Sequence, residues 1–305
     1  MEDNDVVVAA ELCLECYSQR GGPGHVTEID LPILRAPFTA TTSGASTGPP
    51  LQQMTRFIVR QRDDALLVAF RGTASIADVA MLAELPIRWA ANALRRVFSS
   101  NGESRPASTD VELEIAGSPA GRTFSGFANH YRGLAERLRQ SIQTTLRDSL
   151  GIRRVVFAGH SLGGVSATLA ALEFLRGPSQ LPASVVTFGA PPVGDPGFCR
   201  AFRAASGRLM QHARVWAARG DVVPRLRACE GAAHLPGPGV EDPRGRFREL
   251  MVGDVEGPAG EEGPREGVSA GAQLLEWFQK TALAEHSMLR FLDEVRRIEG
   301  AGRRP

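Results

Sequence analysis

The central third of the chain alternates short apolar runs typical of β-strands with runs typical of helices. Arg154-Val-Val-Phe-Ala is followed by a helical run, Leu162–Arg176, that ends at the stop signal Gly177-Pro178. The strand Ser184-Val-Val-Thr-Phe comes next, then a short helix over Phe198–Ala205 and a strand over Ala213–Ala218. This alternation predicts an α/β fold, with a mostly parallel sheet that carries helices on both faces.

The flanking sequence adds further predicted elements around this centre. We expect helices over residues 6–18, 76–98 and 127–150, and one or two helices over 268–299. Thr55–Arg60 and Ala65–Phe70 predict a hairpin or sequential strands, Val111–Ile115 a short strand, and Phe247–Val252 an edge strand. Residues 19–53 and 229–267 are rich in Gly and Pro, so we expect them to form loops apart from that edge strand. The sequence has no internal repeat and no convincing domain boundary, so we expect one domain over residues 1–305.

Composition excludes several classes of protein. No apolar run reaches the roughly 18–20 residues of a membrane span, and a net charge of +1 gives no electrostatic reason to bind nucleic acid. Cys13 and Cys16 form a CxxC inside a predicted helix without a second Cys or His pair, so we expect no metal. The acidic N-terminus lacks the basic and apolar regions of a secretory signal, which predicts a soluble, cytoplasmic protein.

Gly159-His-Ser-Leu-Gly lies where the predicted strand passes into the predicted helix. This G-x-S-x-G pattern places a serine on a tight strand-to-helix turn, which exposes its hydroxyl above the sheet as a nucleophile. The next backbone N–H, that of Leu162, lies at a helix N-terminus and can stabilise an oxyanion. The alternative is a glycine-rich turn that does no chemistry.

Further segments follow in the order of a known family. They are Phe70-Arg-Gly-Thr, Asp78 with Leu85, Ser125-Gly-Phe with Tyr131, the GHSLGG elbow, Thr187-Phe-Gly-Ala-Pro-Pro-Val-Gly-Asp and Gly220-Asp-Val-Val-Pro-Arg-Leu. Over residues 55–227 the chain resembles the class 3, or fungal-type, lipases of the α/β-hydrolase superfamily. It departs from the family at Phe124, where a His is frequent, and at Pro192, where an Arg is usual, and both positions bear on substrate preference.

The resemblance implies an α/β-hydrolase fold and a serine esterase. In such enzymes the acid and the base follow the serine in the chain. Asp221 comes after a predicted strand and fits the acid. His286, in Ala284-Glu-His-Ser-Met-Leu-Arg-Phe-Leu, resembles the family's late histidine at the start of its closing helix, with Met288 and Leu292 as anchors. The alternative base is His234, in a loop soon after Asp221.

The remaining predicted site features lie around the first motif. Thr73 is expected to supply the second oxyanion donor, beside Leu162. Residues 74–98 fall where the family has its lid, with apolar Ile87, Trp89, Leu94 and Phe98 among arginines, as on a helix that lies on a lipid interface. The alternative is a helix packed permanently on the domain.

These features predict a hydrolase of glycerolipid esters that works without metal or cofactor. A phospholipase A1 or a small-ester esterase is the alternative enzyme, and a lipase-like scaffold that binds partners without catalysis is the alternative of another class. The expected partner is a lipid ester, at a lipid–water interface if the lid exists, and the oligomeric state stays open.

Overall fold

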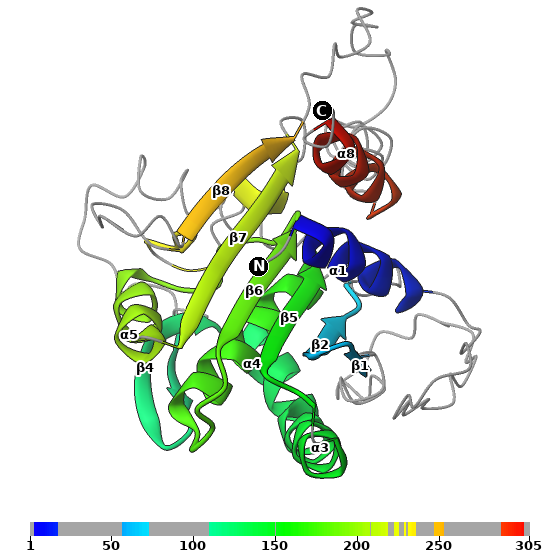
Figure 1. Cartoon of the computed structure of the whole chain (residues 1–305). Coiled ribbons are helices and arrows are strands. Elements are labelled where there is room, and N and C mark those ends of the chain that lie inside the picture. Colours follow the sequence, from blue (N-terminus) through cyan, green and yellow to red (C-terminus); the bar gives the residue numbers. More distant parts are fainter. Residues whose placement is uncertain are drawn as a thin grey trace, which may run out of the picture.

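A six-stranded sheet organises the computed structural model (Figure 1). The structure describes residues 3–17, 57–72, 110–149, 151–207, 209–218, 223–225, 229, 231–235, 247–252 and 288–301. The strands of this sheet are β1 (Phe57–Arg62), β2 (Ala65–Phe70), β5 (Arg154–His160), β6 (Ala183–Phe188), β7 (Met210–Ala218) and β8 (Phe247–Val252).

The order of these strands across the sheet is β1-β2-β5-β6-β7-β8. β1 and β2 form an antiparallel hairpin, and every later neighbour is parallel. The register places Phe70 of β2 beside Gly159 of β5, and His160 of β5 beside Phe188 of β6. The predicted hairpin, the mostly parallel sheet and the edge strand Phe247–Val252 are therefore confirmed.

Helices cover both faces of the sheet, as predicted (Figure 1). Helices α1 (Asp3–Glu15) and α8 (Met288–Ala301) pack on one face, while α3 (Ser125–Asp148), α4 (Leu162–Arg176) and α5 (Pro196–Ser206) pack on the other. Side chains along β2 alternate between the two faces: Leu66 and Val68 pack with α3 and α4, and Leu67 packs with α1 and α8.

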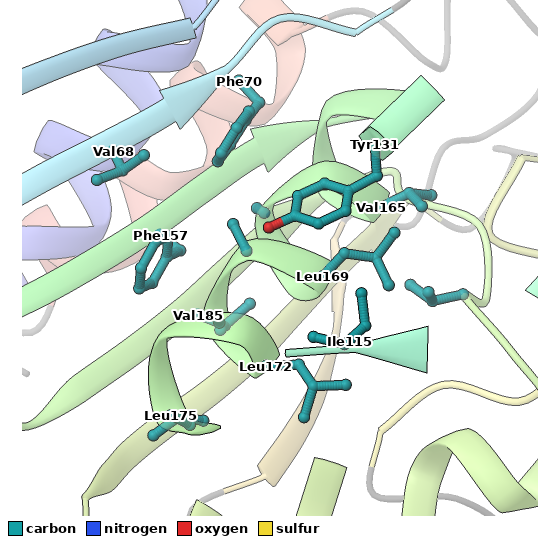
Figure 2. Close-up of a cluster of buried hydrophobic side chains, with 14 of the residues drawn as sticks. Val68, Phe70, Ile115, Tyr131, Phe157, Val165, Leu169, Leu172, Leu175 and Val185 are labelled. Carbon is teal, nitrogen blue, oxygen red and sulfur yellow. The ribbon is translucent and has the colours of Figure 1, made fainter. Parts of the chain in front are cut away.

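The larger core lies between the sheet and α4. Figure 2 shows Val68, Phe70 and Phe157 of the strands on one side, and Leu169 and Leu172 of α4 on the other. All five side chains are buried. Each such burial contributes about 1.5–3 kcal/mol, so this layer holds α4 against the sheet.

A separate two-stranded ribbon, β3 (Asp110–Ile115) with β4 (Ser118–Phe124), was only half predicted. The sequence of β4 carries Pro119 and Gly121, which are depleted in strands. The ribbon forms because Ala116 and Gly117 both adopt positive φ, 51° and 69°, which suits a tight two-residue hairpin turn.

The predicted helices over 6–18, 127–150 and 162–176 are confirmed within a few residues at their ends. The predicted loop 19–53 and the predicted helix 76–98 lie outside the described residues, as do most of 229–267 and the first part of 268–299. None of the helices that the structure describes is long and apolar enough to cross a membrane.

Candidate active site

Ser161 occupies the single residue between β5 and α4. Its backbone has φ 56° and ψ −128°, a conformation that L-residues rarely adopt. Such a conformation costs about 1–3 kcal/mol and persists only where the surroundings impose it. Two hydrogen bonds of 2.9 Å impose it here: the Ser161 N–H donates to the Phe188 carbonyl, and the Gly164 N–H donates to the Ser161 carbonyl.

The glycine of the motif at position 163 allows the helix to begin this close to the sheet. A Cβ atom on Gly163 would lie 2.3 Å from the carbonyl oxygen of Phe70, the last residue of β2. No real side chain tolerates that distance, so only glycine permits the first turn of α4 to touch the segment Phe70-Arg-Gly. The elbow and this segment are therefore in direct backbone contact.

The Ser161 hydroxyl is buried but unsatisfied within the described residues. The side chain is 2 % exposed, and its Oγ has no hydrogen-bond partner among the residues that the structure describes. Buried hydroxyls normally have one. Beside it, the Leu162 N–H is the first amide of α4 and has no acceptor within its own helix. A hydroxyl and a free amide at a helix N-terminus thus lie on consecutive residues.

Tyr17, just beyond α1, joins this region from the far end of the sequence. The Gly72 N–H donates to the Tyr17 hydroxyl at 3.0 Å, and that hydroxyl lies 2.7 Å from Nδ1 of His160. Burial raises the pKa of Tyr17 well above its ordinary value, so the hydroxyl keeps its proton. Tyr17 could not be predicted as part of this region, because the sequence near it indicates only the end of an apolar helix.

Of the two histidines considered as base, only His234 lies within the described residues. Its Nε2 is 2.7 Å from the Pro224 carbonyl, to which it donates. The ring lines a cavity of about 20 Å³, the room that one water needs. Thr187 lines the same cavity, and its buried hydroxyl has no partner within the part of the chain described.

The other predicted site residues fall outside the described residues. They are Thr73, Asp221, His286 and the four lid residues Ile87, Trp89, Leu94 and Phe98. The structure does describe the segments that precede or follow them. Gly72 comes directly before Thr73, β7 ends three residues before Asp221, and α8 begins two residues after His286.

The start of α8 packs beside the elbow. Met288 and Leu292, the predicted anchors, are both buried. Phe291 is fully buried, and its ring centroid lies 6.1 Å from that of His160 and 6.1 Å from that of Phe188. The helix that follows His286 therefore contacts the residue before Ser161.

Cysteine side chains do not form a site in the described region. None of the four forms a disulfide and all are buried, and burial raises the pKa of the Cys13 thiol, which makes it a poor metal ligand or nucleophile. Within the ranges described, no three His, Cys, Asp or Glu side chains gather as metal ligands would.

The geometry around Ser161 agrees with comparison to known proteins. The family model for lipase (class 3) matches residues 67–231, more than half of the 305-residue chain. The chain belongs to the class 3 lipase family. It is therefore a serine hydrolase of the lipase type, and its general reaction is the hydrolysis of esters.

Solved structures share the fold of this lipase at low sequence identity. The Rhizomucor miehei triacylglyceride lipase is 18 % identical with a TM-score of 0.54, over 83 % of this chain and 81 % of its own. A triacylglycerol lipase described as having a serine protease triad is 18 % identical with a TM-score of 0.55, at the same coverage. A Penicillium expansum triacylglycerol lipase is 13 % identical with a TM-score of 0.51, over 82 % of this chain and 78 % of its own. The likeness shows the α/β-hydrolase fold.

Proposed function

We propose that this lipase hydrolyses carboxylic esters of glycerolipids with Ser161 as nucleophile, His286 as base and Asp221 as acid. The observation that carries the proposal is the elbow itself. Ser161 has a strained backbone at the carboxyl end of a central parallel strand, and its hydroxyl has no partner among the described residues. Strain of this kind concentrates at functional sites.

The proposed reaction follows the chemistry of an acyl-enzyme. Ser161 Oγ attacks the ester carbonyl while His286 takes its proton, and His286 then gives that proton to the leaving alcohol. Asp221 orients the imidazole and stabilises its charged form. The Leu162 and Thr73 amides stabilise the tetrahedral oxyanion. Water, activated by His286, then releases the acid and regenerates Ser161.

Two observations support His286 over His234. The Nε2 atom of His234 already donates to the Pro224 carbonyl, whereas a triad histidine needs one ring nitrogen for the serine and the other for the acid. In addition, α8 begins two residues after His286, and its Phe291 packs against His160, the neighbour of Ser161.

The end of β7 supports Asp221 as the acid. β7 is parallel to β6, and β6 is parallel to β5, so all three strands end at the same edge of the sheet. Active sites of open α/β sheets collect at this edge. Asp221 follows the last residue of β7 by three positions, and Ser161 follows the last residue of β5 directly.

The substrate class rests on the family and on the expected lid. A helix over residues 74–98 that exposes Trp89 and Phe98 would bind a lipid surface, because burying each ring there contributes about 1.5–3 kcal/mol. We therefore expect activity on a triacylglycerol to rise sharply when the substrate passes from monomers to droplets. Smooth saturation through the solubility limit would favour a small-ester esterase with an open site.

Labelling with a fluorophosphonate probe tests the nucleophile. Ser161→Ala should lose both the label and ester hydrolysis and keep its unfolding midpoint. Ser184→Ala is the matched control, since Ser184 is equally buried one strand away and should leave both unchanged. A panel of p-nitrophenyl esters, triacylglycerols and phospholipids then identifies the substrate. Near-full turnover by Ser161→Ala would refute the mechanism, and an unlabelled parent protein would indicate a scaffold.

A further inference from the structure

One half-buried hydroxyl, that of Tyr17, bridges two segments that are far apart in the sequence. The Gly72 N–H, 55 residues away, donates to it at 3.0 Å. Nδ1 of His160, 143 residues away, lies 2.7 Å from it. Gly72 comes directly before Thr73, and His160 comes two residues before Leu162. The hydroxyl therefore joins the residues that lead into both proposed oxyanion donors.

The atoms around this hydroxyl are closely packed. A Cβ atom on Gly72 would lie 2.4 Å from the His160 carbonyl oxygen, 2.6 Å from the Tyr17 hydroxyl and 2.8 Å from Cβ of Ser161. The Gly72 backbone thus touches the elbow and the hydroxyl together. A small movement of Gly72 would change its distance to Ser161 directly.

The protons of the bridge can be assigned from its donors and acceptors. The Gly72 amide can only donate, so the hydroxyl accepts from it. The proton of the hydroxyl then has Nδ1 of His160 as its acceptor, and this satisfies all three groups. The His160 ring is held in this orientation by edge contacts with Tyr17, at 5.8 Å between centroids, and with Phe291, at 6.1 Å.

We propose that Tyr17 is a positioning residue whose hydroxyl fixes the spacing between the two halves of the oxyanion hole. The inference rests on the proposed function, because it takes the amides of Thr73 and Leu162 as the oxyanion donors. Tyr17 acts on the oxyanion donors through its contacts with Gly72 and His160. It holds Gly72 against the elbow so that the next amide along the chain is aimed before substrate arrives, which is when preorganisation lowers the barrier.

Replacing the two tyrosines of the chain separately tests this role. Tyr17→Phe removes only the bridging hydroxyl. The matched control is Tyr131→Phe, since the Tyr131 hydroxyl also makes a part-buried hydrogen bond, which it donates to Glu173 at 2.6 Å between α3 and α4. For a short soluble ester we expect Tyr17→Phe to lower kcat by about 10–100-fold, below the loss for deleting an oxyanion donor outright, while KM stays within about twofold because the acyl contacts remain. Tyr131→Phe should keep kcat.

Stability measurements separate positioning from general destabilisation. Tyr17→Phe loses two part-buried hydrogen bonds between neutral groups, and Tyr131→Phe loses one to a carboxylate, which is worth more than a neutral bond, so both unfolding midpoints should fall. A low kcat in Tyr17→Phe alone, measured well below both midpoints, supports the proposal. An unchanged kcat in Tyr17→Phe overturns it, and so does an equal fall of kcat in both variants.

A spectroscopic readout decides the matter even where Tyr17→Phe folds poorly. The chain has two tyrosines, so the Tyr131→Phe protein grown with 3-fluorotyrosine carries the label at Tyr17 alone. Reaction of Ser161 with a phosphonate places an oxyanion-like oxygen in the hole. The ¹⁹F signal of Tyr17 should then shift, because its Gly72 donor adjoins the loaded donor. A label at Tyr131, in the Tyr17→Phe background or in the doubly labelled parent, should not move. An unmoved Tyr17 signal on a fully phosphonylated enzyme overturns the proposal.

The two hypotheses fail in different ways. A parent protein without esterase activity or Ser161 labelling contradicts the proposed function, and the positioning role with it. An active, labelled parent whose Tyr17→Phe variant is equally active contradicts the positioning role alone.

Discussion

Replacing Ser161 by glycine should make the protein more stable while it abolishes hydrolysis. The backbone of Ser161, at φ 56° and ψ −128°, lies where any residue with a Cβ is strained. Ser161→Gly and Ser161→Ala both delete the hydroxyl, and they differ only in that Cβ. The comparison between the two variants therefore isolates the strain.

The magnitude follows from two opposed terms. Relief of the strain favours glycine by about 1–3 kcal/mol. The greater freedom of glycine in the unfolded chain favours alanine by about 0.4–1 kcal/mol. We expect Ser161→Gly to exceed Ser161→Ala in free energy of unfolding by about 1.3 kcal/mol, the difference between the midpoints of these ranges, with an upper bound of about 2.6 kcal/mol.

Urea unfolding followed by tryptophan fluorescence measures this difference, with Ser184 as the control site. Ser184 is buried near the start of β6 and has no positive φ. There glycine should be less stable than alanine by about 0.5–1 kcal/mol. If glycine is the less stable residue at both sites, the elbow stores no strain and the reasoning is wrong.

Three further predictions concern the base, the core and the thiols. His286→Ala should lower kcat by on the order of 10³ or more and His234→Ala far less, and the reverse ranking in ester assays would move the base to the loop of His234. Phe157→Ala should lower the free energy of unfolding by about 3–5 kcal/mol in urea titrations, because the ring is fully buried between the sheet and its helices; a loss under about 1 kcal/mol would contradict that packing. Burial raises the pKa of Cys199 from 9.0 to about 11, so the folded protein keeps a proton that the unfolded chain releases. The contribution of this thiol to the free energy of unfolding should therefore be fully present below pH 9 and be lost as the pH rises toward 11. Cys199→Ala should flatten that slope in unfolding curves measured across this pH range.

Local pattern was sufficient for the elements of the central sheet. Strands such as β5 and β6 are short, apolar and bounded by turn residues, and α4 ends at Gly177-Pro178, so local sequence determines where each begins and ends. The elbow was likewise predictable, because only glycine fits beside the nucleophile and G-x-S-x-G records that steric demand in the sequence.

Elements that depend on distant partners were not predictable in this way. β4 contains Pro119 and Gly121, and its conformation is stabilised by its pairing with β3 and by contacts such as the Asp195 N–H to the Arg122 carbonyl at 3.0 Å. Neither partner can be inferred from the strand's own residues. The sequence therefore predicted only the first strand of this ribbon, Val111–Ile115.

The sequence by itself determined the α/β alternation, the strand-to-helix turn that carries the proposed nucleophile Ser161, and the family to which the chain belongs. Only the tertiary structure decided that Tyr17 meets Gly72 and His160, and that Phe291 packs on the same histidine. The physical reason is how far apart the interacting residues lie along the chain. A steric demand between neighbouring residues leaves a motif in the sequence. A hydrogen bond between residues 143 positions apart forms only when the tertiary structure packs α1 and α8 on the same face of the sheet.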